Sequence, residues 1–492
     1  MRKFLLIGVS TFALGAAAMA YADQVARRPD AETYKMLELF GDVLATVEDQ
    51  YVVPVDDKKL IQAAIDGMLT SLDPHSGYLD ADSFDDMRDQ TRGEYGGLGL
   101  QVQSEDGAVK VVSPMDGTPA SRAGILAGDY ITAIDGQSVV GLPLDQAVKQ
   151  MRGPVGSPIT LTVAREKTDP FSVKLTREII NVKSVTARAE GEFGYIRISG
   201  FDEKTGAETR AAIRDLKTKI PGMKGMVLDL RNNPGGLVDQ SVEVASAFLD
   251  GGEVVSQRGR DPRDIQRYNA RAGGDLLRGL PVVVIVNNGS ASASEIVAGA
   301  LRDRKRAEVI GLTSFGKGSV QTVIPLRGGV DGALKLTTAR YFTPSGQSIQ
   351  KTGIQPDLEV ASSKEEAERV ADSAFQFSEA SFHNALDADA GKTRRAAHTP
   401  TEIPPDGYDA KKEDFQLARA LDVLRAGSVE AAVRTKPVKT YAMVTPYKVG
   451  PAVSATPAAT TNAGAATEAK PVAPSILAPA DKIAPRAPAP AR

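Results

Sequence analysis

The sequence predicts a multidomain α/β protein, and three successive patterns along the chain support that fold class. Residues 36–87 carry apolar side chains at spacings of three and four, which is typical of helices. Residues 93–176 contain short apolar runs interrupted by glycines, which is typical of strands and turns. Beyond Gly191 strand and helix patterns alternate, which favours a largely parallel sheet flanked by helices. The expected parts are an N-terminal helical region at 30–92, a β-rich domain with helices at 93–178, an α/β core at 179–362 and a C-terminal helical region at 363–440.

The first residues have the pattern of an export signal. Arg2 and Lys3 precede an apolar run, Phe4 to Ala20, which ends in small residues suitable for cleavage. We therefore predict a signal peptide at 1–22 that is removed, so that the mature chain is exported. The alternative is that the same run remains as an uncleaved membrane anchor, although it is short for that purpose.

The composition excludes several classes of protein. The chain has no cysteine, which excludes a disulfide framework, a lipoprotein attachment site and cysteine-based catalysis or zinc binding. A formal charge of -3 over 492 residues gives no reason to expect nucleic acid as a partner. From about Thr445 the chain is rich in Ala, Pro and Thr without apolar periodicity, which predicts a disordered tail at 441–492.

The β-rich domain begins with a glycine-rich loop. The loop Gly97-Leu98-Gly99-Leu100 precedes an alternating strand, so its N–H groups could hold a terminal carboxylate while the strand edge pairs with a peptide. Alone, the loop would ordinarily be a structural turn. Four patterned segments follow it, Val111 to Pro114, Thr118 to Ile125, Gly128 to Gly136 and Leu144 to Met151. With the loop, they resemble a PDZ domain over 93–178, which implies binding of peptide C-termini with Gly97, Leu98, Gly99 and Leu100 as the carboxylate-binding loop.

A serine-rich turn is the strongest candidate for chemistry. Asn288 to Glu295 joins a buried-strand pattern to a helix pattern, which puts small hydroxyl side chains at a helix N-terminus. Free N–H groups and the helix dipole favour developing negative charge there. The alternative is that Ser292 and Glu295 form only a capping box, S-x-x-E.

A lysine is the better candidate base for such a serine. The chain has three histidines, His75, His383 and His398, and all lie outside the alternating α/β segment. Lys317 lies in a Gly-flanked loop twenty-five positions after Ser292. A lysine, with a reference pKa of about 10.4, accepts a proton only if burial lowers that pKa. The same loop falls one residue short of a phosphate-binding loop and carries Gly318 where a hydroxyl is required, so nucleotide binding is the weaker interpretation.

A double-glycine turn could supply an oxyanion hole. The strand pattern Val227 to Leu230 leads through Gly235 and Gly236 into a helix pattern, and such a turn can present backbone N–H groups to an oxyanion. Alone, it would be an ordinary helix start.

Together these elements resemble the carboxyl-terminal processing proteases, or tail-specific proteases, which are PDZ-containing serine peptidases of the bacterial envelope and the chloroplast lumen. The resemblance implies that Ser292 is the nucleophile, Lys317 the general base and Gln321 its supporting hydrogen-bond partner. It places the oxyanion hole at the N–H of Ala293 and of Gly235 or Gly236, and implies no metal or cofactor. The matching motifs are Ser71 to Ser76, Leu228 to Gly236, Ser290 to Glu295, Phe315 to Gln321 and Lys335 to Gly346.

The resemblance implies an exported, periplasmic serine endopeptidase that recognises protein C-termini and cleaves near the tail. Expected partners are substrates with free C-termini, an adaptor protein in the envelope and further copies of the chain.

The helices at 36–87 and near Glu413 are the candidate oligomerisation elements, with core packing as the alternative. Arg152, at the end of a predicted helix, is a candidate contact between the PDZ and catalytic domains, with a solvent-facing side chain as the alternative. The rival functions are an inactive peptide-binding scaffold and a crotonase-like acyl-transfer enzyme.

Overall fold

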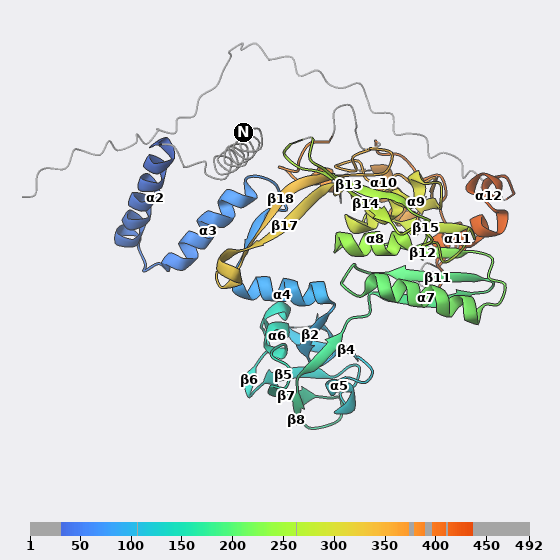
Figure 1. The fold of residues 1–492 in the computed structure, drawn as a ribbon. Helices are drawn as coiled ribbons and strands as arrows, with labels where there is room; N and C mark the ends of the chain where they lie inside the picture. The colour runs from blue at the N-terminus through green and yellow to red at the C-terminus, as the bar shows by residue number, and fades with distance from the viewer. Residues whose placement is uncertain are drawn as a thin grey trace, which may run out of the picture. The chain divides into compact units, whose positions relative to one another are not determined.

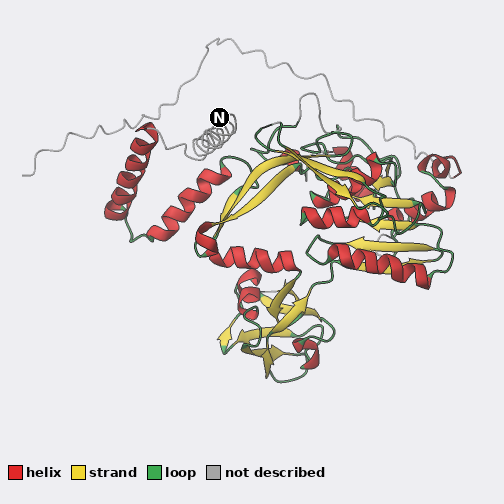
Figure 2. Ribbon diagram, viewed as in Figure 1, coloured by secondary structure: helices red, strands yellow, loops and turns green. Residues whose placement is uncertain are grey.

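The computed structural model describes residues 31–105, 107–261, 263–372, 378–388, 396–409 and 412–435 (Figures 1 and 2). The predicted signal peptide at 1–22 and the predicted tail at 441–492 lie outside these residues. The predicted α/β fold class is confirmed. Within the described ranges, no helix is long and apolar enough to cross a membrane, and no group of three or more His, Cys, Asp or Glu is arranged to hold a metal ion.

The N-terminal region is mostly helical but contains one strand that the sequence pattern did not predict. Its helices are α2 (Ala31–Gln50), α3 (Asp57–Thr70) and α4 (Ala81–Arg92). Between α3 and α4, the short strand β1 (Gly77–Leu79) pairs antiparallel with β18 (Ala333–Phe342). The side chain of Asp80 caps α4, and Gly93 ends it in the left-handed conformation. The pairing of β1 joins the N-terminal region to a sheet of the catalytic core.

The PDZ-like domain is a small antiparallel sheet with two helices. Its strand order is β3-β4-β5-β7-β8, with β6 on β5, so β3 (Leu100–Glu105) is an edge strand. The separate ribbon of β2 (Glu94–Gly97) and β9 (Glu178–Asn181) brings the chain in and out of this domain. The remaining elements are β4 (Ala108–Pro114), α5 (Pro119–Arg122), β5 (Tyr130–Ile134), β6 (Gln137–Ser138), α6 (Leu144–Met151), β7 (Pro158–Ala164) and β8 (Phe171–Thr176).

The largest sheet follows the predicted strand and helix alternation. Its order is β10-β11-β12-β15-β16-β19, parallel except for β10 at one edge. Helices α7 (Thr205–Lys219), α8 (Val238–Ser246) and α9 (Ala293–Asp303) pack on one face, and α11 (Phe415–Ala426) packs on the other. Every residue of β15 is therefore buried, as expected for a parallel strand covered on both faces. The strands are β10 (Val185–Glu190), β11 (Phe193–Ile198), β12 (Met226–Asp229), β15 (Val282–Val286), β16 (Glu308–Gly311) and β19 (Leu358–Glu359).

A second sheet of the core is antiparallel and was not predicted as a unit. Its order is β1-β18-β13-β14, and β17 (Ser319–Pro325) also pairs with β18 in the long hairpin of Figures 1 and 2. The other members are β13 (Gly252–Arg258) and β14 (Ile265–Ala270). Because β17 begins two residues after Lys317, this hairpin positions the loop that carries the candidate base.

The C-terminal helices pack on the core. In α11, Leu417, Ala420 and Val423 are buried against the parallel sheet. The helix near Glu413 therefore packs in the core of the chain, which was the alternative to a role in oligomerisation. The flanking helices are α10 (Lys364–Asp372) and α12 (Val429–Thr435).

Candidate active site

Ser292 lies at a strained turn between β15 and α9. It is the N-cap of α9, with φ 55° and ψ -112°, a backbone conformation that non-glycine residues rarely adopt. Strained strand-to-helix turns of this kind expose catalytic hydroxyls in other hydrolases. The neighbouring serines are committed elsewhere, because Ser290 Oγ donates to Leu230 O (2.7 Å) and Ser294 Oγ donates to Asn233 O (2.9 Å). The middle serine is thus the one whose backbone is strained and whose hydroxyl lines a cavity.

A buried carboxylate joins the turn of Ser292 to the loop of Lys317. The side chain of Glu295 is fully buried and accepts four hydrogen bonds, from the N–H groups of Ser292 (2.8 Å), Gly316 (2.7 Å) and Lys317 (2.9 Å) and from Ser314 Oγ (2.5 Å). Burial raises the pKa of Glu295, and these hydrogen bonds oppose that rise. The bond from the Ser292 N–H is the Glu295 half of the predicted capping box, so capping and the positioning of Lys317 use one carboxylate.

Lys317 is half-buried and its amine is easily deprotonated. Burial, with a contribution from the positive charge of Lys335, lowers its pKa to about 8. The negative charges of Glu379, Glu295 and Asp73 act in the opposite direction. Lys317 can therefore be a neutral amine near pH 8, as a general base requires.

Ser292, Lys317 and Gln321 line one cavity of about 590 Å³. Within the described part of the chain, the structure gives no hydrogen bond between Lys317 Nζ and Ser292 Oγ. The Gln321 amide donates to Ser319 Oγ (3.0 Å) and Thr337 Oγ1 (3.2 Å), and no bond from it to Lys317 is found. The three residues that the sequence singled out are brought together, in a geometry looser than a reacting complex needs, as is common in sites without substrate.

The double-glycine turn lies directly against Ser292. A Cβ atom on Gly235 would lie 2.8 Å from Ser292 Cβ, so a side chain is not tolerated there. The Gly235 N–H donates to Asn233 Oδ1 (2.9 Å). The N–H groups of Gly236 and Ala293 have no hydrogen-bond partner among the described residues. Of the two glycines that the sequence left open, Gly236 is the one with a free donor.

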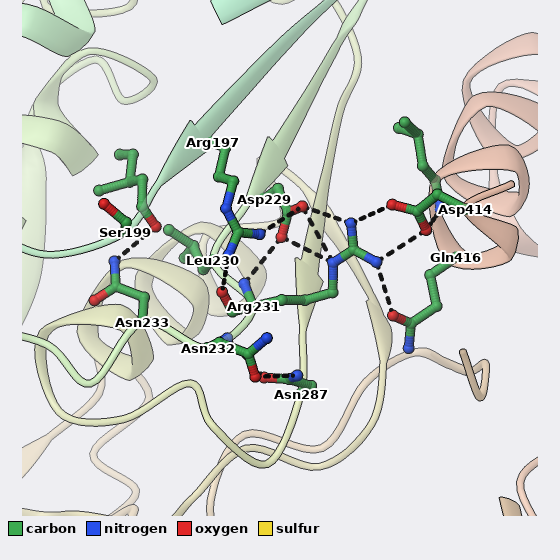
Figure 3. Close-up of polar contacts among 12 residues, drawn as sticks. Arg197, Ser199, Asp229, Leu230, Arg231, Asn232, Asn233, Asn287, Asp414 and Gln416 are labelled. Carbon is green, nitrogen blue, oxygen red and sulfur yellow. Dashed lines mark hydrogen bonds and ion pairs between the residues drawn. The ribbon is translucent and has the colours of Figure 1, made fainter. Parts of the chain in front are cut away.

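A polar network holds this turn in place (Figure 3). Asn232 and Asn287 exchange two hydrogen bonds, the Asn232 N–H to Asn287 Oδ1 (2.9 Å) and Asn287 Nδ2 to Asn232 Oδ1 (2.8 Å). The Arg231 guanidinium donates to the buried Asp229 and to Asp414 at the start of α11. These links fasten the double-glycine turn to the serine turn and to the C-terminal helix. Sequence reasoning missed them because their partners lie far apart along the chain.

The alternative chemistries do not fit the geometry. None of the three histidines lines the cavity with Ser292. The loop that resembles a phosphate-binding loop has no free N–H groups to offer a phosphate at Gly316, Lys317 and Gly318, because Glu295 accepts the first two and Gln350 Oε1 accepts the third (2.8 Å).

The predicted carboxylate-binding loop lies beside the edge strand β3. Gly97 and Leu98 are buried, and the N–H groups of Leu98 and Gly99 have no hydrogen-bond partner among the described residues. Gly99 has φ 74°, and a Cβ atom there would lie 2.3 Å from Thr118. The loop thus offers two free donors at the start of an unpaired strand edge, the arrangement that peptide C-termini require.

Arg152 lies at the rim of the same cavity. Its guanidinium covers the ring of Tyr95 (4.6 Å) and pairs with Asp86 of α4 (3.7 Å). It lines the cavity together with Ser292 and Lys317. The Arg152 side chain therefore contacts other residues, and the alternative interpretation, a side chain that only faces solvent, does not hold.

Comparisons with known proteins place this chain near characterised families. Family models match at residues 11–83 (Activating protease CtpB N-terminal domain), 86–164 (PDZ domain) and 192–360 (Peptidase family S41). A carboxy-terminal-processing protease of Bartonella bacilliformis is 48% identical over 446 residues, 90% of this chain and 100% of that protein. A solved photosystem II D1 C-terminal processing protease is 32% identical, covering 65% of this chain and 92% of that one, with a TM-score of 0.39.

Proposed function

Because this chain belongs to the carboxy-terminal-processing proteases and is a serine peptidase of family S41 with a PDZ domain, we propose that Ser292 is its nucleophile and Lys317 its general base. The observation that carries this proposal is that a strained serine and a lysine of lowered pKa line one cavity. Hydrolysis of an unfolded protein with a free apolar C-terminus, by the unaltered chain and by Ser292→Ala, tests it.

The proposed reaction is acyl transfer to serine followed by hydrolysis. Neutral Lys317 takes the proton of Ser292 Oγ as this oxygen attacks the carbonyl carbon of the scissile bond, and the lysine then gives the proton to the leaving amine. The N–H groups of Ala293 and Gly236 stabilise the oxyanion; losing one such donor typically costs about 10²- to 10³-fold in rate. Water, activated by Lys317, then releases the acyl group from Ser292.

We also propose that the PDZ domain recruits substrates by their free C-termini, which concentrates cleavage near the tail. The free donors of Leu98 and Gly99 beside the edge strand β3 support this role. A charged carboxylate gains about 1.5–3 kcal/mol from each such hydrogen bond, whereas an amide gains less.

Amidation of a peptide C-terminus is accordingly expected to weaken binding by roughly 10- to 100-fold. Binding is measured by fluorescence anisotropy with a labelled peptide that ends in an apolar residue, in the Ser292→Ala background so that the peptide survives. The Gly99→Ala variant, in which the new Cβ meets Thr118, is expected to lose binding of the free acid as well. Equal affinity for the acid and the amide would remove the proposed role of the loop.

We propose that the chain is exported to the periplasm and acts there on misfolded or tail-marked proteins, with an adaptor protein as a further partner. The basic start and apolar run of residues 1–22 support export. Cell fractionation, with N-terminal sequencing of the mature chain, tests this proposal: cytoplasmic protein with an intact N-terminus would contradict it.

We further propose that helix α2 mediates assembly with a second copy of the chain. No residue of α2 is buried, and its apolar side chains recur at helical spacing. Met36, Leu37, Phe40 and Val43 are between 44% and 58% exposed. An apolar stripe of this kind on an otherwise unpacked helix favours an apolar partner of the same kind.

The double variant Leu37→Glu/Phe40→Glu is therefore expected to reduce the molar mass in solution to that of one chain, measured by size-exclusion chromatography with light scattering. Lys35→Glu, which changes charge on the same helix outside the apolar stripe, is the matched control. An unaltered chain that is already monomeric would contradict the proposal.

A further inference from the structure

The turn Asp73-Pro74-His75-Ser76 lies between α3 and β1, more than two hundred residues before Ser292 in the sequence. Asp73 and Ser76 are only 4% and 3% exposed. The sequence singled out this turn as a motif without assigning it a role, and it does not line the catalytic cavity. Its polar side chains nevertheless connect, through two separate hydrogen-bond chains, to Gln321 and to the loop of Lys317.

The first chain runs from Asp73 to Gln321 through Thr337 of β18. Asp73 Oδ1 accepts a hydrogen bond from Thr337 Oγ1 (3.0 Å), and the Thr337 N–H donates to Ser76 Oγ (3.1 Å). Thr337 Oγ1 in turn accepts the bond from Gln321 Nε2 (3.2 Å). The position of the Gln321 amide therefore depends on a carboxylate from the N-terminal region.

The second chain runs from His75 to the backbone on both sides of Lys317. His75 Nε2 hydrogen-bonds to Glu379 Oε2 (2.8 Å), and Glu379 Oε1 accepts from Gln350 Nε2 (2.9 Å). Gln350 Oε1 accepts the N–H of Gly318 (2.8 Å), and the Glu379 N–H donates to Phe315 O (3.0 Å). The side chain of Glu379 is almost fully buried, and the hydrogen bond with His75 supplies a partner for an oxygen that has no access to water.

We infer that Asp73 and His75 are positioning residues of the peptidase, which hold Gln321 and the Lys317 loop in place from the N-terminal region. This inference rests on the proposed function of Lys317 as the base. It explains why a turn outside the cavity carries two buried polar side chains, Asp73 and Ser76, and a largely buried His75. It also makes the base side of the active site depend on the segment between α3 and β1. The serine side is held by the Asn232–Asn287 pair and by Glu295, and Glu295 also binds the Lys317 loop.

The charges near Lys317 provide a separate test, because residues with only a structural role would leave the pH dependence of activity unchanged. The groups that act on Lys317 are Lys335 of β18, Glu295 of α9, Glu379 and Asp73, and the three carboxylates favour the charged lysine. Neutralising Asp73 or Glu379 without changing its shape removes one of these charges. The remaining positive charge and burial then lower the pKa of Lys317 further, so activity persists to lower pH even as the rate falls.

The experiment compares Asp73→Asn, Glu379→Gln, His75→Ala and His75→Gln in the full chain. The first three variants are expected to lower kcat by roughly 10- to 100-fold, since a misplaced catalytic group costs about that much, with KM nearly unchanged. In Asp73→Asn and Glu379→Gln the acidic limb of the pH profile is expected to move to lower pH. His75→Gln, which keeps a donor for Glu379, is expected to recover most of the activity lost in His75→Ala.

Ser71→Ala is the matched control, because Ser71 is exposed and its Oγ donates only to Met68 O within α3. Folding of each variant is followed by thermal unfolding and by binding of a C-terminal peptide. Unchanged kcat and an unchanged pH profile in folded Asp73→Asn or Glu379→Gln would overturn the inference, as would equal activities of His75→Ala and His75→Gln. An active Ser292→Ala enzyme would instead overturn the proposed function itself, so the two failures are distinguishable.

Discussion

The Ser292→Ala variant is expected to hydrolyse peptide bonds roughly 10⁴- to 10⁶-fold more slowly than the unaltered enzyme. Alanine occupies the same strained backbone position but has no oxygen to form the acyl-enzyme. The residual rate would come from the oxyanion donors and from substrate positioning. The measurement is cleavage of an unfolded protein with a free apolar C-terminus, with an envelope extract added in parallel so that a required partner is supplied.

The fold of this variant should be unaffected. Glu295 binds the backbone N–H of residue 292 and not its hydroxyl, so the links between the serine turn and the Lys317 loop remain. Thermal unfolding and C-terminal peptide binding should match those of the unaltered chain. Cleavage by Ser292→Ala at the unaltered rate would exclude Ser292 as the nucleophile.

The flanking serines are expected to behave differently. Ser290→Ala and Ser294→Ala each remove one of two donors from a buried backbone carbonyl, and Ser290→Ala also leaves the buried Asn287 N–H without its acceptor; the loss of such hydrogen bonds costs about 1–3 kcal/mol of stability. Their effect should therefore appear mainly in the unfolding temperature. This contrast separates the catalytic hydroxyl from two structural ones within five residues of sequence.

Much of this site could be predicted from sequence because its parts carry local patterns. The run Val282 to Val286 is apolar throughout, as a strand covered on both faces must be, and the serine turn follows it directly. The glycines at 97, 99, 235 and 236 mark places where the backbone needs positive φ or close approach.

The connections between these parts could not be predicted, because no local pattern encodes them. Strand β1 has three residues, too few for a recognisable alternation, and its partner β18 lies more than 250 positions later. The His75–Glu379 contact spans 304 positions. The S-x-x-E spacing likewise suggested only a capping-box role for Glu295, as the alternative to catalysis, and only the fold shows that its second oxygen also accepts hydrogen bonds from the Lys317 loop.

The choice between Gly235 and Gly236 is a similar case. Both residues look alike in sequence, and both have positive φ in the structure. What separates them is one hydrogen bond, from the Gly235 N–H to Asn233 Oδ1, which leaves the Gly236 donor free. Such an assignment requires the position of a side chain two residues away.

Replacing Lys317 is expected to have an effect close to that of removing Ser292. Lys317→Ala removes the base, and Lys317→Arg keeps the positive charge but cannot lose its proton at accessible pH. Both variants should lower kcat by roughly 10³-fold or more, and the double variant Ser292→Ala/Lys317→Ala should be hardly slower than either single variant, since the two groups act as a unit. Activity in Lys317→Arg would show that only the charge matters and would exclude Lys317 as the base.

The pH dependence of the unaltered enzyme provides the independent test. Because Lys317 must be neutral to accept a proton and its pKa is about 8, kcat/KM should rise with pH and level off above that value. Well below the pKa, the rise should be about tenfold per pH unit. A lysine with its ordinary pKa would instead give activity still rising at pH 10, and a histidine base would give a plateau already at neutral pH. The pH at which kcat/KM stops rising therefore identifies the base without any mutation.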